Sequence, residues 1–306
     1  MITLASGVSY LDLRFQNLPG VIATAVLHGP GGVALVDPGP SSTLPTLRAT
    51  LVEGGLSMAE VGAVLLTHIH LDHAGATGTL VRDHPWLRVY VHEKGAPHLI
   101  DPEKLLASAT RLYGDAMDRL WGEVRPVPPP ALIVLKGGEH IEVGGRAIDI
   151  EYTPGHASHH VSYFNRDTGV AFVGDTAGIK LAPGAYVLPP TPPPDIDLEA
   201  WQASLVRIGR WGADTLFLTH FGPSAPEAPH VTALAEHLEL VSRLAKASLA
   251  REGTDEARSQ WFVEQIRGEL GRWMSEAEVA AYEVAGRFDL SWRGLARYWR
   301  TRGARI

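Results

Sequence analysis

One short run, residues 67–73, constrains this chain more than any other feature. Directly behind the apolar run 63–66 it places four metal-ligand side chains, His68, His70, Asp72 and His73. If residues 63–67 form a buried strand, side chains two positions apart point to the same side, so the first two histidines face one position and the next two ligands a second. We interpret the run as half of a two-metal hydrolytic centre, with a solvated polar loop as the alternative.

Three later segments repeat this arrangement, in which an apolar strand is followed by a loop that carries a ligand-type side chain. The three side chains are His156 after residues 148–152, Asp175 after residues 171–173, and His220 after residues 215–218. Pro154 and Gly155 predict a sharp turn that exposes the imidazole of His156. Open α/β folds place their sites at the ends of strands, so we expect all these ligand candidates at one edge of the sheets.

The region up to residue 222 alternates short β-branched runs with Gly and Pro turns. We expect strands at residues 21–27, 33–36, 64–66, 89–91, 148–150, 161–164, 171–173 and 215–218. Helical patterns lie between some of them, near residues 44–54, 74–84, 102–121 and 198–211. Such an order predicts sheets with helices on their outer faces, which is a layered α/β protein.

The sequence becomes helix-rich and more charged towards its end. Helical patterns cover residues 230–251, 255–271 and 275–302, and the last two begin with capping signals at Thr254 and Ser275. We therefore expect a catalytic region over residues 1–222 and a helical region over residues 223–306.

Two proline-rich stretches, residues 126–130 and 189–194, cannot lie inside helices or central strands. We expect both to be ordered surface connections. The second is expected to be a plain stiff linker, and a position over the site is the alternative.

Composition limits the partners and the chemistry. A formal net charge of -7 without a Lys/Arg block argues against a nucleic-acid or anionic-membrane surface. The chain has no Cys, so His, Asp and Glu are the strong ligands, and these suit zinc, iron or manganese.

The start of the chain lacks a signal-peptide pattern, and no stretch of eighteen apolar residues follows. We therefore expect a soluble, cytoplasmic protein. We expect its partner to be a small-molecule substrate.

Five ordered motifs make the chain resemble a metallo-β-lactamase-fold hydrolase, closest in style to the glyoxalase II-like branch. The matching pieces lie at residues 35–39, 67–75, 153–160, 173–176 and 218–220. They span roughly residues 20 to 222 in the order of the family. The resemblance implies an αββα sandwich, a metallo-β-lactamase fold, with a two-metal site at the edge between two sheets.

Carried over residue by residue, the resemblance implies two ligand sets. It assigns His68, His70 and His156 to the first metal, and Asp72, His73 and His220 to the second, with Asp175 bridging both. We expect Asp37 to hydrogen-bond a ligand or its loop, while capping of the turn at Gly39 is an equal alternative. His160 is expected to be a packed, hydrogen-bonded residue that binds no metal.

The resemblance implies that two divalent metal ions, with zinc as the first expectation and iron or manganese as alternatives, activate a shared water. The resulting hydroxide would attack a thioester, ester or lactone carbonyl. Asp72 is expected to be the catalytic residue that orients this nucleophile and moves its proton. The alternatives are a mononuclear iron enzyme that resembles persulfide dioxygenases, and a phosphodiesterase or nuclease of the same fold. A lactonase-like Tyr three positions after Asp175 is absent.

The remaining histidines, among them His98 and His230, have no companions at ligand spacing and are expected on the surface or in the core. The aromatic residues of the helical region, such as Trp292 and Trp299, recur at helical spacing and are expected in the core in preference to a substrate pocket. Trp side chains exposed on this region would support a homodimer.

Overall fold

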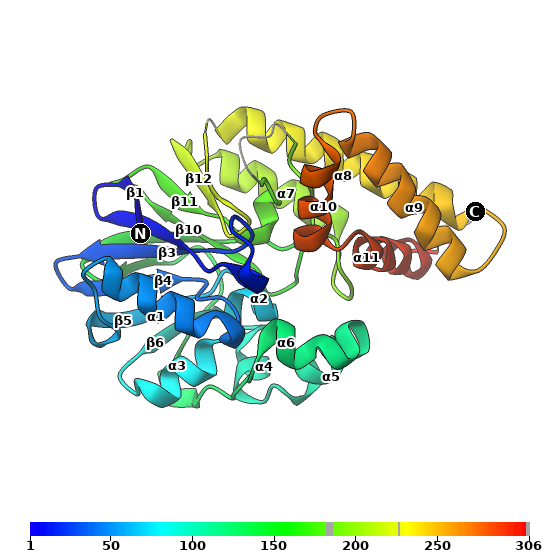
Figure 1. Ribbon diagram of the computed structural model, residues 1–306. Coiled ribbons are helices and arrows are strands. Elements are labelled where there is room, and N and C mark those ends of the chain that lie inside the picture. Colours follow the sequence, from blue (N-terminus) through cyan, green and yellow to red (C-terminus); the bar gives the residue numbers. More distant parts are fainter. Residues whose placement is uncertain (182–185, 226, 304–306) are drawn as a thin grey trace.

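Two β-sheets packed face to face form the centre of the computed structural model, which describes residues 1–181, 186–225 and 227–303 (Figure 1). Within these residues the first sheet has seven strands in chain order: β1 (Ile2–Ala5), β2 (Val8–Asp12), β3 (Ala23–Gly29), β4 (Gly32–Val36), β5 (Val61–Leu65), β6 (Arg88–His92) and β7 (Leu132–Leu135). Its first four strands are antiparallel, and β4 to β7 are parallel.

The second sheet has six strands in the described residues, in the order β13 (Gly222–Ser224), β12 (Thr215–Leu218), β11 (Val170–Phe172), β10 (Val161–Asn165), β9 (Arg146–Tyr152) and β8 (His140–Val143). All pairs are antiparallel except β11 with β12. The β10–β11 hairpin turns at residues 166–169.

The strand periodicity explains why the two sheets pack on each other. In β3, Ala25 and Leu27 belong to the core between the sheets, whereas Val26 faces the helices on the outer side. Tyr163 and Phe172 enter the same inner core from the second sheet. Alternation of this kind gives each strand one face for the partner sheet and one for the helical layer.

Helices cover the outer faces of both sheets (Figure 1). The helices associated with the first sheet are α1 (Leu44–Glu53), α2 (Leu71–Ala74), α3 (Thr77–Asp83), α4 (Ala96–Ile100), α5 (Glu103–Tyr113) and α6 (Met117–Trp121). Helix α7 (Leu198–Gly209) packs Ile208 against Leu216 and Leu218 of the second sheet. The single helix expected over residues 102–121 is divided into α5 and α6, because Gly114 between them has a positive φ of 50°.

Four helices form the helical layer near the end of the chain: α8 (Glu227–Leu249), α9 (Asp255–Leu270), α10 (Glu276–Gly286) and α11 (Phe288–Thr301). Thr254 and Ser275 cap α9 and α10, as predicted. The one helix expected over residues 275–302 is wrong, because Arg287 adopts a left-handed conformation and separates α10 from α11. Residues 182–185, 226 and 304–306, which the two expected regions include, lie outside the described residues.

The expected strands omitted five of the observed ones, β1, β2, β7, β8 and β13. β1 and β8 lie at the edges of their sheets and are largely exposed, so they lack the continuous apolar run of a buried strand. No helix in the described part of the chain has the length and apolar character needed to cross a membrane.

Trp292 and Trp299 pack in the core as expected, whereas Trp273 is exposed. Trp292 is buried and its indole N–H donates to Ser248 Oγ at 2.7 Å, while Trp299 donates to the carbonyl of Ser242 at 3.2 Å. Both rings join the core cluster of α8, α9 and α11, which also contains Trp201 of α7.

Leu295→Ala tests the contribution of this cluster. The side chain is fully buried on α11, so its truncation should lower the free energy of unfolding by about 2–5 kcal/mol. Trp273→Ala is the matched control, because that ring is 61% exposed and its loss should change stability by no more than about 0.5 kcal/mol. Urea unfolding followed by circular dichroism measures both; equal effects would contradict the assignment.

Candidate metal centre

All seven ligand candidates lie together at one edge between the two sheets. His68 and His70 follow β5, while Asp72 and His73 lie in the short helix α2. His156 follows β9, Asp175 lies directly after β11 in the 3-10 turn Gly174–Ala177, and His220 follows β12. Strands from both sheets therefore deliver ligand-type side chains to one place, as the sequence predicted.

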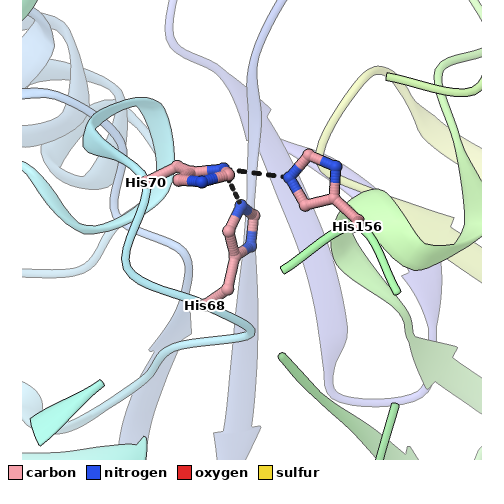
Figure 2. Close-up of side chains that lie close together, drawn as sticks. All are labelled: His68, His70 and His156. Carbon is pink, nitrogen blue, oxygen red and sulfur yellow. Dashed lines mark hydrogen bonds between the residues drawn. The ribbon is translucent and has the colours of Figure 1, made fainter. Parts of the chain in front are cut away.

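The first group consists of three imidazoles (Figure 2). Nδ1 of His70 lies 2.9 Å from Nε2 of His68 and 2.9 Å from Nε2 of His156. The three ring nitrogens thus converge on one point, although His70 and His156 are 86 positions apart in the sequence. Convergent neutral imidazole nitrogens are a typical set of ligands for a first-row metal.

The second group adds carboxylates. Oδ2 of Asp72 lies 3.3 Å from Nε2 of His220 and 3.8 Å from Nε2 of His73. Asp175 lies between the groups: its Oδ2 is 3.4 Å from Nε2 of His156, and its Oδ1 is 3.3 Å from Nε2 of His73. One carboxylate therefore faces both groups of histidines with different oxygens.

The outer ring nitrogens fix how the imidazoles are oriented. Nδ1 of His156 donates to the carbonyl of Pro190 at 2.9 Å, and Nδ1 of His220 donates to the carbonyl of Val21 at 2.7 Å. A carbonyl only accepts, so the proton resides on Nδ1 and leaves the lone pair on Nε2, which points into the centre. This is the arrangement in which histidine binds a metal.

Asp37 connects the loops that carry the ligand candidates. It accepts hydrogen bonds from the backbone N–H of Thr67 at 2.8 Å, the hydroxyl of Thr67 at 2.7 Å, Nδ1 of His73 at 2.8 Å and the hydroxyl of Thr219 at 2.8 Å. The sequence-based expectation that Asp37 bonds a ligand or its loop is confirmed. His160 is also packed as expected, with Nδ1 at 3.0 Å from the hydroxyl of Thr153.

Two glycines let the backbone approach where a side chain could not fit. Gly155 has a φ of 143°, and a Cβ there would lie 2.3 Å from Cβ of Trp201, while Gly174 has a φ of 44° and a Cβ there would lie 2.5 Å from the hydroxyl of Thr67. The Trp201 indole lies edge-on to the ring of His156, with centroids 5.7 Å apart, and donates to the carbonyl of Thr176 at 2.7 Å. Trp201 thus supports the loops before His156 and after Asp175 at once.

Burial keeps the first group of imidazoles neutral. It lowers the pKa of His68 well below the usual value, with a further contribution from the neighbouring ring of His73. Burial lowers the pKa of His70 to about 4, and it also lowers the pKa of His156. At neutral pH these rings therefore carry free lone pairs, which is the state that metal binding requires.

The carboxylates have the opposite effect on the second group. Burial by itself would raise the pKa of Asp175, but the imidazoles of His73 and His220 outweigh it and hold that pKa well below its usual range. Burial likewise opposes a charge on His73, yet Asp175 and Asp72 raise its pKa well above the usual value. The surroundings of His73 and Asp175 therefore favour a positive charge.

The donor atoms fit divalent cations. Among the described residues, Nε2 of His73 and Oδ1 of Asp175 are buried and form no hydrogen bond. Leaving such atoms unpaired costs about 1–3 kcal/mol each, and a cation between them would use both lone pairs. Three groups have donor atoms within 4.8 Å of one another: His68 with His70 and His156, His68 with His73 and Asp175, and Asp72 with His73 and His220.

A pocket of about 280 Å³ leads to this centre, with Asp72, His156 and Asp175 among its lining residues. The expectation that residues 189–194 are a plain linker is wrong, because Pro190 and Pro192–Pro194 line the pocket. Sequence reasoning also missed the walls contributed by α4, α5 and α11, including His98, Tyr113 and Leu290. The helical pattern at residues 102–121 signalled the helix but not which face turns to the site.

Comparison with known sequences is consistent with this geometry. The sequence model of the metallo-β-lactamase superfamily matches residues 18–220. A metallo-β-lactamase fold-containing protein of Sulfurisphaera tokodaii is 27% identical over 229 residues, which are 73% of this chain and 79% of that protein. A hydroxyacylglutathione hydrolase of Synechococcus sp. is 31% identical over 168 residues, which are 54% of this chain and 53% of that enzyme. The match thus spans about half the length of that relative.

Solved structures share the fold over nearly the whole chain. A metallo-β-lactamase family protein of Thermus thermophilus superposes with a TM-score of 0.72 at 25% identity, covering 99% of this chain and 96% of that one. An archaeal superfamily protein from Sulfolobus tokodaii has a TM-score of 0.64 at 23% identity, covering 94% and 98%. With a family match over most of its length and two packed sheets that carry His and Asp at their shared edge, this chain belongs to the metallo-β-lactamase superfamily.

Proposed function

We propose that the protein is a hydrolase that uses two divalent metal ions to cleave a thioester, ester or lactone carbonyl. His68, His70 and His156 would hold one ion, Asp72, His73 and His220 the other, and Asp175 both. The observation that carries the proposal is that Asp175 presents one oxygen to each group, 3.4 Å from His156 and 3.3 Å from His73. Zinc is the first expectation for the metal, with iron or manganese as alternatives, since nitrogen and oxygen donors suit all three.

When bound, the metal ions supply a hydroxide nucleophile at neutral pH and polarise the carbonyl oxygen. Asp72 is suited to orient that nucleophile by accepting a hydrogen bond from it. Its side chain is 24% exposed and lines the pocket, whereas the side chains of His73 and His220 beside it are buried. Burial would raise the pKa of Asp72, but His73 and His220 outweigh this and lower it to about 2, so it is a carboxylate at neutral pH.

The carbonyl substrate class is supported by the hydroxyacylglutathione hydrolases among the relatives, although the match covers about half of their length. The ligand loops form one part of the pocket wall, and helices and prolines form the rest. A pocket of this kind suits a small molecule. We expect no nucleic acid to bind there, given the acidic net charge of -7.

A substrate panel separates the proposed reaction from its alternatives. The purified protein should hydrolyse a thioester, an ester or a lactone, and leave bis-p-nitrophenyl phosphate and glutathione persulfide unchanged, because its two metals are expected to act on a carbonyl. Turnover of the phosphodiester alone would overturn the carbonyl assignment. Oxygen consumption with the persulfide, together with one iron per chain, would indicate the mononuclear oxygenase class.

His70→Ala should remove metal and activity together. The wild-type protein is expected to carry about two divalent ions per chain, and the variant to lose activity by more than about 100-fold, because one of three converging imidazoles is gone. Elemental analysis, turnover and circular dichroism measure this. His140→Ala is the matched control, since that side chain is 76% exposed and lies in none of the three groups. Full metal content in His70→Ala would contradict the ligand assignment.

Asp37→Asn should weaken metal binding without removing a ligand. The amide keeps the size of the side chain, but its NH₂ group cannot accept the hydrogen bonds from Thr67, His73 and Thr219 that a carboxylate accepts together. We expect metal affinity to fall by about 10–100-fold, measured by competition with a chromogenic chelator. An unchanged affinity would show that Asp37 merely supports the fold.

A further inference from the structure

The pocket above the candidate centre has walls of two kinds. Helix α5 contributes the apolar side chains of Leu105, Ala109 and Leu112, which repeat at helical spacing along one face. Leu290 of α11 contributes a further apolar side chain to the lining. A substrate in this pocket therefore contacts mostly hydrocarbon next to the metal ligands.

Two lysines give part of the lining a positive charge. Lys94 follows β6, and Lys104 lies in the first turn of α5. Lys94 donates to the hydroxyl of Tyr152 at 2.7 Å, and that hydroxyl donates to the carbonyl of Ser158 at 2.8 Å, so the ammonium is held in place by neutral groups. Neither lysine forms an ion pair with a carboxylate within the part of the chain that the structure describes.

The acidic residues of the lining form no ion pair with these lysines in the described residues. Asp72 and Asp175 belong to the two ligand groups, and bound cations would offset their charge. Asp195 accepts a hydrogen bond from the hydroxyl of Ser158 at 2.6 Å, and its single negative charge offsets at most one of the two lysines. The third cation of the lining, Arg287, is already paired with Asp289 at 3.2 Å. Lys94 and Lys104 are therefore the positive groups left for a ligand.

We propose that the substrate is a thioester or ester with a short apolar acyl group and an anionic group, such as a carboxylate, that Lys94 and Lys104 bind. This inference rests on the proposed function and adds the substrate class. In the reaction, water adds its hydroxyl to the acyl carbon, the carbon–sulfur or carbon–oxygen bond breaks, and the leaving thiol or alcohol takes the remaining proton. The positive charges of the two lysines would orient the substrate in the pocket and lower the KM for that substrate.

A matched pair of substrates tests the charge preference. Butyryl thioesters of 3-mercaptopropionate and of N-acetylcysteamine share the acyl group and the scissile bond, but only the first is anionic. The protein has no Cys, so released thiol can be measured with a thiol reagent without background from the chain. We expect the metal-loaded protein to prefer the anionic thioester by about tenfold in kcat/KM, mainly through KM, and to lose that preference at high salt.

Charge-removing variants locate the preference. Lys104→Gln and Lys94→Gln should each raise the KM of the anionic thioester by about three- to tenfold, and raise that of the neutral thioester by less, so that the preference for the anionic substrate falls. Lys136→Gln is the matched control, because this substitution removes the same charge from an exposed position outside the pocket lining. An equal effect of all three variants would mean that net charge, and not the pocket, sets the preference.

A binding experiment keeps this inference separate from turnover. The unreactive thioether S-butyl-3-mercaptopropionate should bind the metal-loaded protein more tightly than its neutral counterpart in isothermal titration calorimetry, and Lys104→Gln should remove the difference. Hydrolysis of both thioesters with equal KM, and equal binding of both thioethers, would overturn the charge proposal and leave the proposed function standing. Hydrolysis of neither thioester, together with no turnover of the ester and the lactone of the substrate panel, would contradict the proposed function, and this inference would fall with it.

Discussion

The candidate centre depends on one buried carboxylate. Asp37 is fully buried at the end of β4, and its two oxygens accept four hydrogen bonds from Thr67, His73 and Thr219. A charge removed from water at this depth is tolerated only where such partners compensate it. Because Thr67 follows a strand of the first sheet and Thr219 follows a strand of the second, the same compensation joins the sheets at the edge where the ligand candidates gather.

Near this carboxylate the protein keeps buried polar atoms that only a cation would pair. Nε2 of His73 and Oδ1 of Asp175 have no hydrogen-bond partner among the described residues, and the neutral rings of His68, His70 and His156 turn their nitrogens towards one another. Such an arrangement costs folding free energy, and metal binding would return it. The stability of the fold and the occupancy of the centre are therefore linked quantities.

The ligand candidates could be predicted from sequence because both their chemistry and their position are local signals. Each follows an apolar run, as His68 follows residues 63–66 and His220 follows residues 215–218. The α/β class follows from the same runs. The pocket walls could not be predicted, because residues far apart in the chain, such as Leu105 of α5 and Leu290 of α11, line the same pocket, and the local pattern of α5 does not show which of its faces turns there. The break between α10 and α11 has Arg287, and not Gly, in the left-handed position, and edge strands such as β1 and β8 are too exposed to leave an apolar pattern.

The wide spacing of the ligand candidates affects how the protein is made. His68 leaves the ribosome long before His220. The two must come together at the edge of the sheets where Asp37 accepts a hydrogen bond from Thr219. A nascent chain that stops short of β12 lacks Thr219 and His220, so Asp37 has lost one of its four hydrogen bonds and the second sheet lacks β12 and β13. The full set of ligand candidates therefore exists only after β12 has been made and has joined the second sheet.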